Sequence, residues 1–308
     1  MIDQGLHSAP QVPQRVIVTG GAKGIGAEIV QSFADLGAEV VVATRDEVAA
    51  ANFAAAVNAR IGRRAITAAR LDLSSLVSIQ AFAAQQSDIP VDILVNNAGV
   101  MELSRTHTAD GFESNFGVNF VGHFVLSNLL VHSLCIGRTK RIIQLTSGAH
   151  RVAPIDLDDL NFEARPFNGE AAYRESKTAC SLLAVALSDR FRSTGIDAFS
   201  VAPGIVPTDL LRSMGDAQSE LMMGRFPSAV RSPREAARSV IYAATDRELS
   251  GRGGLYIEDC RPAAPSDGQS PSGFAPHGVD PLLARALWQK TEAMLNTRTP
   301  DWAEPARV

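Results

Sequence analysis

Residues 15–26 read Arg-Val-Ile-Val-Thr-Gly-Gly-Ala-Lys-Gly-Ile-Gly, a short apolar run followed at once by a glycine-rich turn. The apolar run predicts a buried strand. Helical periodicity follows, because Ile25, Ile29, Phe33 and Leu36 fall on one face. A glycine turn between a strand and a helix lets the backbone approach a pyrophosphate, and the helix N-terminus adds N–H donors and positive potential. We therefore expect a dinucleotide-binding turn; a glycine-rich turn with no ligand is the alternative.

Outward from this turn, strand and helix patterns alternate along the chain. The predicted strands cover residues 15–19, 39–43, 65–71, 91–95, 141–145, 197–201 and 254–257. The predicted helices cover residues 24–36, 47–60, 75–86, 111–136, 171–193, 233–246 and a last segment from 281. Strands that are apolar throughout and alternate with helices indicate a parallel sheet covered on both faces. We expect an α/β fold in a single domain, a Rossmann-type doubly wound parallel sheet of about seven strands with helices on both faces.

Composition narrows the function classes. The chain has 308 residues, 45% hydrophobic and 20% charged, so it can bury a sizeable core. Lys+Arg 29 against Asp+Glu 33 gives −4, which disfavours a nucleic-acid partner held by phosphate contacts. No run approaches the roughly 18 apolar residues of a membrane-spanning segment. The polar start, with Asp3, indicates no signal peptide, and three widely spaced cysteines suit reduced thiols in a cytoplasmic protein.

The composition also changes near both ends of the chain. Residues 261–280 are rich in Pro, Gly and Ser and predict an irregular loop before a helix with Pro281 at its first position. We divide the chain into an N-terminal extension (1–14), the dinucleotide-binding domain (15–257) and a C-terminal extension with a final helix (258–308).

The end of the second strand bears on which dinucleotide is bound. NAD readers place an acid there for the ribose 2′-hydroxyl, about 20 residues after the glycine turn. Here Thr44 leaves that position uncharged and Arg45 follows, whose guanidinium can pair with a 2′-phosphate. Lys23 in the turn adds a second cation. The pattern favours NADP(H), whereas a solvated Arg45 tied up with Asp46 is the alternative.

Polar residues that can carry chemistry follow the later strands. Tyr173 and Lys177 are four residues apart at a helix start, so they share one face. A free phenol ionises only near about pH 10, and a nearby ammonium favours the phenolate that proton transfer requires at neutral pH. Ser147 ends the fifth strand, where its hydroxyl faces the crevice in which ligands bind in open α/β sheets. Asn119 lies within a predicted helix, where its alternative is a polar core contact.

Together these motifs resemble the short-chain dehydrogenase/reductase family over about Arg15 to Tyr256, and its retinol-dehydrogenase-like branch in finer texture. The motifs are Thr19-Gly-x-x-x-Gly-Ile-Gly26, Asn96-Asn-Ala-Gly99, Asn119, Ser147, Tyr173-x-x-x-Lys177 and Pro203-Gly204, in the order of the family. The branch texture lies in residues 116–124, 146–150 and 158–162, and in a long segment between Ser147 and Tyr173.

The resemblance implies a role for each matching residue. The catalytic set would be Asn119, Ser147, Tyr173 and Lys177. Tyr173 would exchange the proton, Lys177 would assist it and hold the nicotinamide ribose, Ser147 would bind the substrate oxygen, and Asn119 would anchor a relay water. The implied cofactor contacts, taken with those from the turn, are Gly20, Lys23, Gly24, Ile25, Gly26, Arg45, Asp72, Leu73, Asn97, Ala98, Gly99, Tyr173, Lys177, Val206 and Thr208.

Some positions depart from the family pattern or lie outside it. Phe120 stands where a His is common in this branch. The loop at about 207–232 would cover the substrate, and its methionines suggest an adaptable apolar pocket, although core packing explains them equally well. The helices at 111–136 and 171–193 are the family's usual surfaces for a homodimer or homotetramer, which the C-terminal extension can cover.

The sequence therefore predicts an NADP(H)-dependent oxidoreductase that interconverts a carbonyl and an alcohol by hydride transfer, with a small-molecule carbonyl or alcohol as substrate. A catalytically inactive NADPH-binding sensor or scaffold is the alternative, and a nucleotide-sugar epimerase or dehydratase is a third reading. We expect no metal site, with His123 and His132 packed or on the surface. The acidic run 156–159 predicts a solvated loop face.

Overall fold

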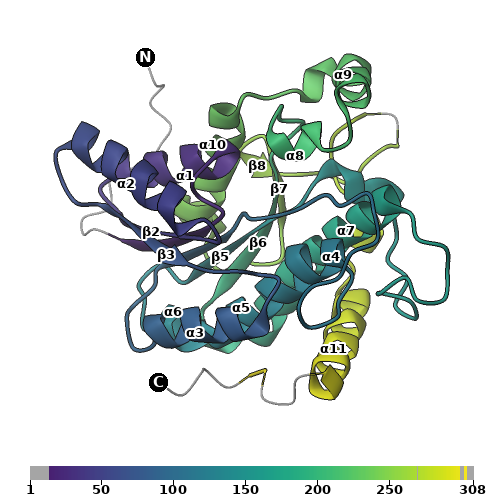
Figure 1. Ribbon diagram of the computed structural model, residues 1–308, viewed down its shortest axis with the longest axis horizontal. Coiled ribbons are helices and arrows are strands. Elements are labelled where there is room, and N and C mark those ends of the chain that lie inside the picture. The colour runs from purple at the N-terminus through teal and green to yellow at the C-terminus, as the bar shows by residue number, and fades with distance from the viewer. Residues whose placement is uncertain (1–13, 269, 299–301, 304–308) are drawn as a thin grey trace.

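The computed structural model describes residues 14–268, 270–298 and 302–303, and a single sheet forms its centre (Figure 1). The strand order is β3-β2-β1-β4-β5-β6-β7-β8, with every pair parallel except β7 and β8. The strands are β1 (Arg15–Thr19), β2 (Glu39–Thr44), β3 (Ile66–Arg70), β4 (Ile93–Asn96), β5 (Arg141–Leu145), β6 (Asp197–Ala202), β7 (Tyr256–Glu258) and β8 (Arg261–Pro262). The predicted doubly wound α/β fold is confirmed. The expected seven strands gain an eighth, antiparallel one in the C-terminal extension.

Helices cover both faces of this sheet, as Figure 1 shows. One face carries α1 (Gly24–Asp35), α2 (Glu47–Ile61) and α10 (Pro233–Thr245). The other carries α3 (Leu76–Gln86), α4 (Ser114–Phe116), α5 (Gly122–Leu129), α6 (Val131–Cys135) and α7 (Gly169–Arg190). The remaining α-helices among the described residues are α8 (Asp209–Arg212), α9 (Asp216–Arg225) and α11 (Pro281–Arg298). Within the described part of the chain, no helix is both long and apolar enough to cross a membrane.

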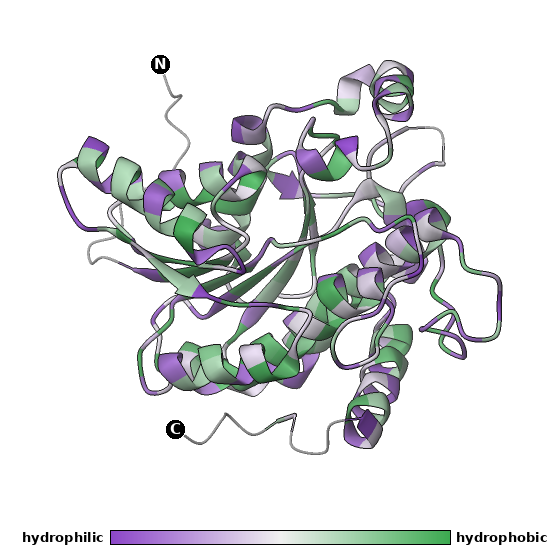
Figure 2. Ribbon diagram, viewed as in Figure 1, coloured by the Kyte–Doolittle hydropathy of each residue, from purple (hydrophilic) through white to green (hydrophobic). Residues whose placement is uncertain are grey.

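The strands are buried on both sides, so their residues divide between two cores. Val16 and Val18 of β1 pack with α1 and α10 residues such as Phe33. Ile17, between them, faces the opposite layer and packs with residues such as Phe124. Successive side chains of a strand point to opposite faces, which is why a continuous apolar run is needed here. Figure 2 shows the resulting concentration of hydrophobic residues along the strands.

The sheet order creates the place for a ligand. Strand β1 pairs with β2 on one side and β4 on the other, so the chain reverses its direction of winding between β1 and β4. Val18 is level with Val95, which brings the turn after β1 beside the residues that follow β4. Ligands of open α/β sheets bind in the crevice outside the carboxyl ends of the strands at such a reversal.

The predicted long helix at 111–136 is interrupted. It comprises α4, a π-helical turn η1 (Gly117–Val121), α5 and α6. Gly117 and Gly122 bracket the wide turn, and both are closely approached: a Cβ would lie 2.4 Å from Thr108 Cγ2 at Gly117 and 2.6 Å from the Leu73 carbonyl oxygen at Gly122. Single π turns are frequent at functional sites, and this one contains Asn119.

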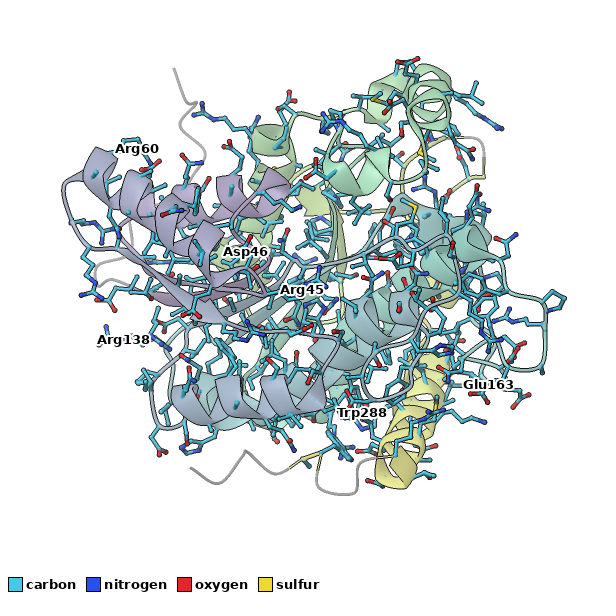
Figure 3. All side chains as sticks on the ribbon, in the orientation of Figure 1. Arg45, Asp46, Arg60, Arg138, Glu163 and Trp288 are labelled. Atoms are coloured by element: carbon cyan, nitrogen blue, oxygen red, sulfur yellow. The ribbon has the colours of Figure 1, made fainter. Side chains whose placement is uncertain are left out.

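The C-terminal extension packs on the layer formed by α5 and α7. Trp288 of α11 is buried, and its ring centroid lies 4.5 Å from that of Phe124 and 6.4 Å from that of Phe191. The guanidinium carbon of Arg190 lies 4.8 Å from the centre of the same indole ring. Figure 3 labels Trp288 where α11 meets the neighbouring helices. Within one chain, α11 therefore covers part of the surface expected for oligomer contacts.

The acidic run at 156–159 is only partly solvated, so that prediction was wrong for Asp159. Its carboxylate is 8% exposed and accepts hydrogen bonds from the backbone N–H groups of Glu163, Ala164 and Arg165 at 2.6–3.1 Å. Burial raises the pKa of Asp159, but these three N–H groups and the Arg165 charge together outweigh it, so that the pKa is lowered overall. The carboxylate thus shapes the loop that leads to α7.

Candidate active site

A cavity of about 570 Å³ lies at the carboxyl ends of β1, β2, β3 and β4. Twelve of the fifteen predicted cofactor residues line it: Gly20, Lys23, Gly24, Ile25, Gly26, Arg45, Asp72, Leu73, Asn97, Ala98, Gly99 and Thr208. Its wall also includes residues that the sequence did not single out, among them Met101, Glu102, Val118 and Arg212. Tyr173, Lys177 and Val206 are not part of this wall.

The glycine turn leaves space where side chains would block the approach. Gly20 and Gly24 have φ angles of +66° and +56°, in the left-handed region that favours glycine. A Cβ on Gly26 would lie 2.4 Å from the Gly20 carbonyl oxygen. Thr208 closes the cradle from the other side, since its methyl lies 3.3 Å from where a Cβ of Gly24 would be. Because α1 begins at Gly24, its free N–H groups point into a cradle that fits a pyrophosphate.

The cations at the cavity differ in their partners. Asp46 caps α2 by accepting a hydrogen bond from the Ala49 N–H at 2.9 Å. Arg45, exposed beside it, has no carboxylate within 4.0 Å among the residues that the structure describes (Figure 3). Lys23 instead pairs with Asp209 of α8 at 3.2 Å, and this contact lowers the pKa of Asp209. The guanidinium of Arg45 is thus free to bind an anion at the end of β2.

Thr19 joins the two strands that flank the cavity. Its hydroxyl oxygen accepts the backbone N–H groups of Asn97 and Ala98, both at 3.0 Å. In return, the side-chain amide of Asn97 donates to the Thr19 and Gly20 carbonyl oxygens at 2.8 and 3.2 Å. These contacts fix the turn after β1 to the turn after β4.

His123 extends this network into η1. Its ring is fully buried, with Nδ1 2.9 Å from the Asn119 carbonyl oxygen and Nε2 3.0 Å from the Thr19 hydroxyl. A carbonyl only accepts, so Nδ1 carries the proton and Nε2 accepts from the Thr19 hydroxyl. Burial lowers the pKa of His123 to about 4, which keeps the ring neutral. The packed histidine expected at this position therefore connects the glycine turn to Asn119.

Asn119 is held on all sides. Its side chain accepts the Val100 N–H at 2.8 Å and donates to the Val100 carbonyl at 3.0 Å and the Ser176 hydroxyl at 2.9 Å. The backbone carbonyl oxygen of Asn119 lies 3.2 Å from the thiol of Cys180. Burial raises the pKa of that thiol, so Cys180 stays protonated and can donate.

Lys177 of α7 approaches the cavity only at Gly99 and does not line it. It is 5% exposed, and its Nζ lies 5.6 Å from the centre of the Tyr173 ring. A methyl group placed on Gly99 would be 3.4 Å from Lys177 Nζ and 3.2 Å from Asn119 Oδ1. Gly99, which does line the cavity, is therefore the point at which α7 and η1 approach the dinucleotide cradle.

Ser147 does not end β5 as predicted: it follows the last residue of that strand, Leu145, by two positions and comes directly after Thr146, a second anchor to α7. Thr146 donates its hydroxyl hydrogen bond to the Lys177 carbonyl at 2.7 Å, which ties β5 to the helix carrying Tyr173. Ser147 is half-buried and starts the 3₁₀ helix η2 (Gly148–Val152), its hydroxyl accepting the Ala149 N–H at 3.2 Å. No group of three or more potential metal-ligating side chains occurs among the described residues.

Several residues that organise this site carry no direct signal in the sequence. Arg165 forms a two-pronged ion pair with Glu175 of α7 at 2.7 and 2.8 Å, which clamps the loop after η2 to the helix of Tyr173. Thr19 stands at a predicted strand end and was quoted only as part of the glycine motif. The signal that marks Thr19 is its position at the end of β1, directly before the glycine turn and one strand away from the turn after β4.

Comparisons with known proteins agree with this geometry. The model of the short chain dehydrogenase family matches residues 14–219. The chain is 37% identical to retinol dehydrogenase 13 of Homo sapiens over 295 residues, covering 94% of this chain and 86% of that protein. It is 37% identical to polyprenol dehydrogenase of Mus musculus over 265 residues, covering 83% and 79%. The RhlG/NADP active-site complex of Pseudomonas aeruginosa is similar in structure, with a TM-score of 0.65, 26% identity and coverage of 80% and 95%.

The chain belongs to the short-chain dehydrogenase/reductase family, and the predicted family is confirmed. It is an oxidoreductase of that family, whose members use NAD(P)(H) and act on small molecules.

Proposed function

We propose that this chain is an NADP(H)-dependent oxidoreductase that interconverts an apolar carbonyl compound and its alcohol. One observation carries the proposal: the buried ammonium of Lys177 and the amide of Asn119 converge on Gly99, which lines the dinucleotide cavity. A cation beside Tyr173, at the point where the cavity meets α7, is the arrangement that carbonyl reduction requires.

The chain's own residues would supply binding, orientation and the proton. Ser147 would donate a hydrogen bond to the substrate oxygen. Tyr173 would give that oxygen a proton in reduction and accept one in alcohol oxidation. Lys177 would hold the nicotinamide ribose beside Tyr173, and Asn119 would anchor a water in the proton relay. A bound nicotinamide cofactor would supply the hydride.

The preference for NADP(H) follows from Arg45. Arg45 lines the cavity and has no ion-pair partner among the described residues, and it stands where the ribose 2′-phosphate would lie. Val206 is buried behind Thr208, whose N–H donates to the Val206 carbonyl at 2.8 Å, so it would act by holding the cradle wall. The remaining cradle residues would hold the pyrophosphate and adenosine. An NADP preference leans toward reduction in cells.

The substrate class is inferred from two sources. Two relatives are named for retinol and polyprenol, both long apolar alcohols. The segment at 207–232 forms α8 and α9, where Met222 and Met223 are half-buried. Methionines adapt to apolar ligands of varied shape. We also propose a cytoplasmic protein, and a homodimer or homotetramer whose contacts use surface that α11 leaves open.

The test is NADPH consumption at about 340 nm across a panel of carbonyl compounds, including aliphatic and aromatic aldehydes, bulky ketones and retinal. NADH and the Tyr173→Phe protein serve as controls. We expect turnover that requires NADPH and falls by at least about 10²-fold in Tyr173→Phe, because a proton-transfer group contributes about 10²–10⁴-fold. NADPH affinity should stay nearly unchanged. Full activity in Tyr173→Phe would refute its role, and tight NADPH binding without any turnover would favour the inactive sensor or scaffold.

A further inference from the structure

A short segment of the C-terminal extension, residues 273–278, lies against the turn that begins at Ser147. We call this segment the strap. His150 makes the connection: its ring is fully buried, and its two nitrogens contact the two sides. Nδ1 lies 2.7 Å from the Ser147 carbonyl oxygen, and Nε2 lies 3.1 Å from the backbone nitrogen of Ala275.

The proton of His150 is fixed by these partners. The Ala275 N–H can only donate, so Nε2 must accept and the proton resides on Nδ1. Nδ1–H then donates to the Ser147 carbonyl. Burial lowers the pKa of His150 to about 4, in agreement with a neutral ring. The ring therefore holds the Ser147 carbonyl in a fixed position relative to the Ala275 N–H of the strap.

The strap has further contacts on the same turn. His277 donates from Nε2 to the His150 carbonyl at 2.8 Å. Arg151 donates to the Gly273 carbonyl at 3.3 Å, and the Gly273 N–H donates to Glu258 at 2.6 Å. The strap is thus attached at its first residue and near its last.

Packing leaves the His150 ring little freedom. The Tyr256 ring centroid lies 5.0 Å away on one side. On another side is Gly278, where a Cβ would lie 2.6 Å from His150 Cδ2. Any side chain at 278 would therefore displace the imidazole.

The rest of the serine turn is anchored to α7. Thr146, before Ser147, donates to the Lys177 carbonyl, and Thr178 of α7 donates to the Ala153 carbonyl at 2.6 Å. These contacts fix the two ends of the turn against the helix that carries Tyr173. The carbonyl of Ser147, between them, is fixed by His150.

We infer that His150 is a positioning residue: it couples the strap to Ser147 and so sets the orientation of the serine hydroxyl toward the substrate oxygen. This inference rests on the proposed function, because Ser147 matters only if the carbonyl reaction occurs. A satisfied core histidine with no effect on catalysis is the competing account.

The two nitrogens can be separated by substitution. His150→Asn keeps an N–H donor near the position of Nδ1 and loses the acceptor for Ala275. His150→Gln keeps an acceptor near the position of Nε2 and loses the donor to Ser147. We expect kcat for the best carbonyl substrate to fall about tenfold or more in the Gln variant and about threefold in the Asn variant, a scale typical of slight misplacement. KM for NADPH should change little in both variants, because His150 does not line the dinucleotide cavity.

Gly278→Ala disturbs the ring from the strap side without changing a nitrogen, and its kcat should fall by between these two amounts. The matched control is His132→Gln. His132 lies exposed on α6 and pairs with Asp88, so this variant should leave kcat within about twofold of the wild type. A purely structural role predicts instead that kcat losses rank with losses of thermal stability, with His150→Asn and His150→Gln equally impaired.

A double-mutant cycle with Ser147→Ala gives the decisive test, read from single-turnover rates at high enzyme concentration. If His150 acts through Ser147, His150→Gln should cost less than about twofold in the Ser147→Ala background. An equal loss in both backgrounds would overturn the inference.

Proton-detected ¹⁵N NMR of histidine-labelled wild-type protein tests the connection without any turnover. We expect the Nδ1–H form of His150, and the Nε2–H form would overturn the coupling to the strap. If the wild type reduces no carbonyl while His150 shows the expected form, the proposed function fails and the structural link survives.

Discussion

Replacing Arg45 by Ala tests the cofactor preference most directly. Arg45 is exposed, lines the cavity and has no carboxylate partner among the described residues, so its removal breaks no internal ion pair. The variant should therefore fold with unchanged stability, and the effect should appear in cofactor binding alone. This separation is what makes the measurement interpretable.

The magnitude follows from the contact that would be lost. A hydrogen bond between charged groups contributes about 1.5–3 kcal/mol, and tenfold in affinity corresponds to about 1.4 kcal/mol. Because Arg45 is solvent-exposed, the lower part of this range applies, and screening by salt reduces it further. We expect NADPH to bind about 10- to 30-fold more weakly to Arg45→Ala, and NADH to change by less than about twofold.

The assay is fluorescence titration of each cofactor at low and high salt, with Arg60→Ala as the control. Arg60 is also exposed, but it pairs with Asp35 and does not line the cavity. The difference between NADPH and NADH should shrink as salt rises. Equal weakening of both cofactors, or no weakening of NADPH, would refute the assignment of Arg45 to the 2′-phosphate.

Two predictions concern stability. Trp288→Ala should lower the free energy of unfolding by about 3–5 kcal/mol, as for other buried tryptophans. Denaturant unfolding followed by circular dichroism measures this change. A loss under about 1 kcal/mol would mean that α11 is not docked on the rest of the chain. Acid should also destabilise the protein, because the pKa of His123 and of His150 is about 4 in the folded chain against 6.5 when unfolded, so that the unfolded chain binds protons first as the pH falls. Each histidine should cost about 2 kcal/mol between about pH 7.5 and pH 5. Glu113 and Glu258 act in the opposite sense, because burial raises their pKa and the folded chain therefore binds their protons first. The test is therefore the difference between wild type and His150→Gln: over this pH range the variant should lose about 2 kcal/mol less of its free energy of unfolding. Identical pH profiles of the two proteins would contradict the prediction.

The elements that sequence reasoning predicted well are those set by local patterns. Strand β1, the glycine turn and α1 follow from consecutive residues, and α11 begins at Pro281 as its proline indicated. Strand β8 was missed because it has two residues, one of them Pro262, and exists only by pairing with β7. The π turn η1 was missed because it depends on what Gly117 and Gly122 pack against, which side-chain periodicity does not contain.

The candidate site shows the same division. Parallel topology places the ends of neighbouring strands together, so the sequence could bring Gly20, Asn97 and Ser147 to one edge of the sheet. The roles of the two buried histidines could not be predicted in this way. His123 contacts Thr19, 104 residues away, and His150 contacts Ala275, 125 residues away. Because these partners are so far apart in the chain, the sequence does not distinguish a buried histidine that holds two backbone segments together from one that only fills the core.

These two histidines also explain how a site assembled from distant segments stays ordered. Each is neutral and buried, and each has one nitrogen that donates to a carbonyl and one that accepts, so each imposes a single orientation on its neighbours. His123 fixes η1 to the turn of Thr19, on the dinucleotide side, and His150 fixes the turn of Ser147 to the strap, on the far side. Helix α7 packs against both η1 and η2 and carries Tyr173 and Lys177. Since a buried, fully bonded polar network tolerates no alternative arrangement without losing hydrogen bonds, we expect the proposed reacting groups to be positioned before any ligand binds.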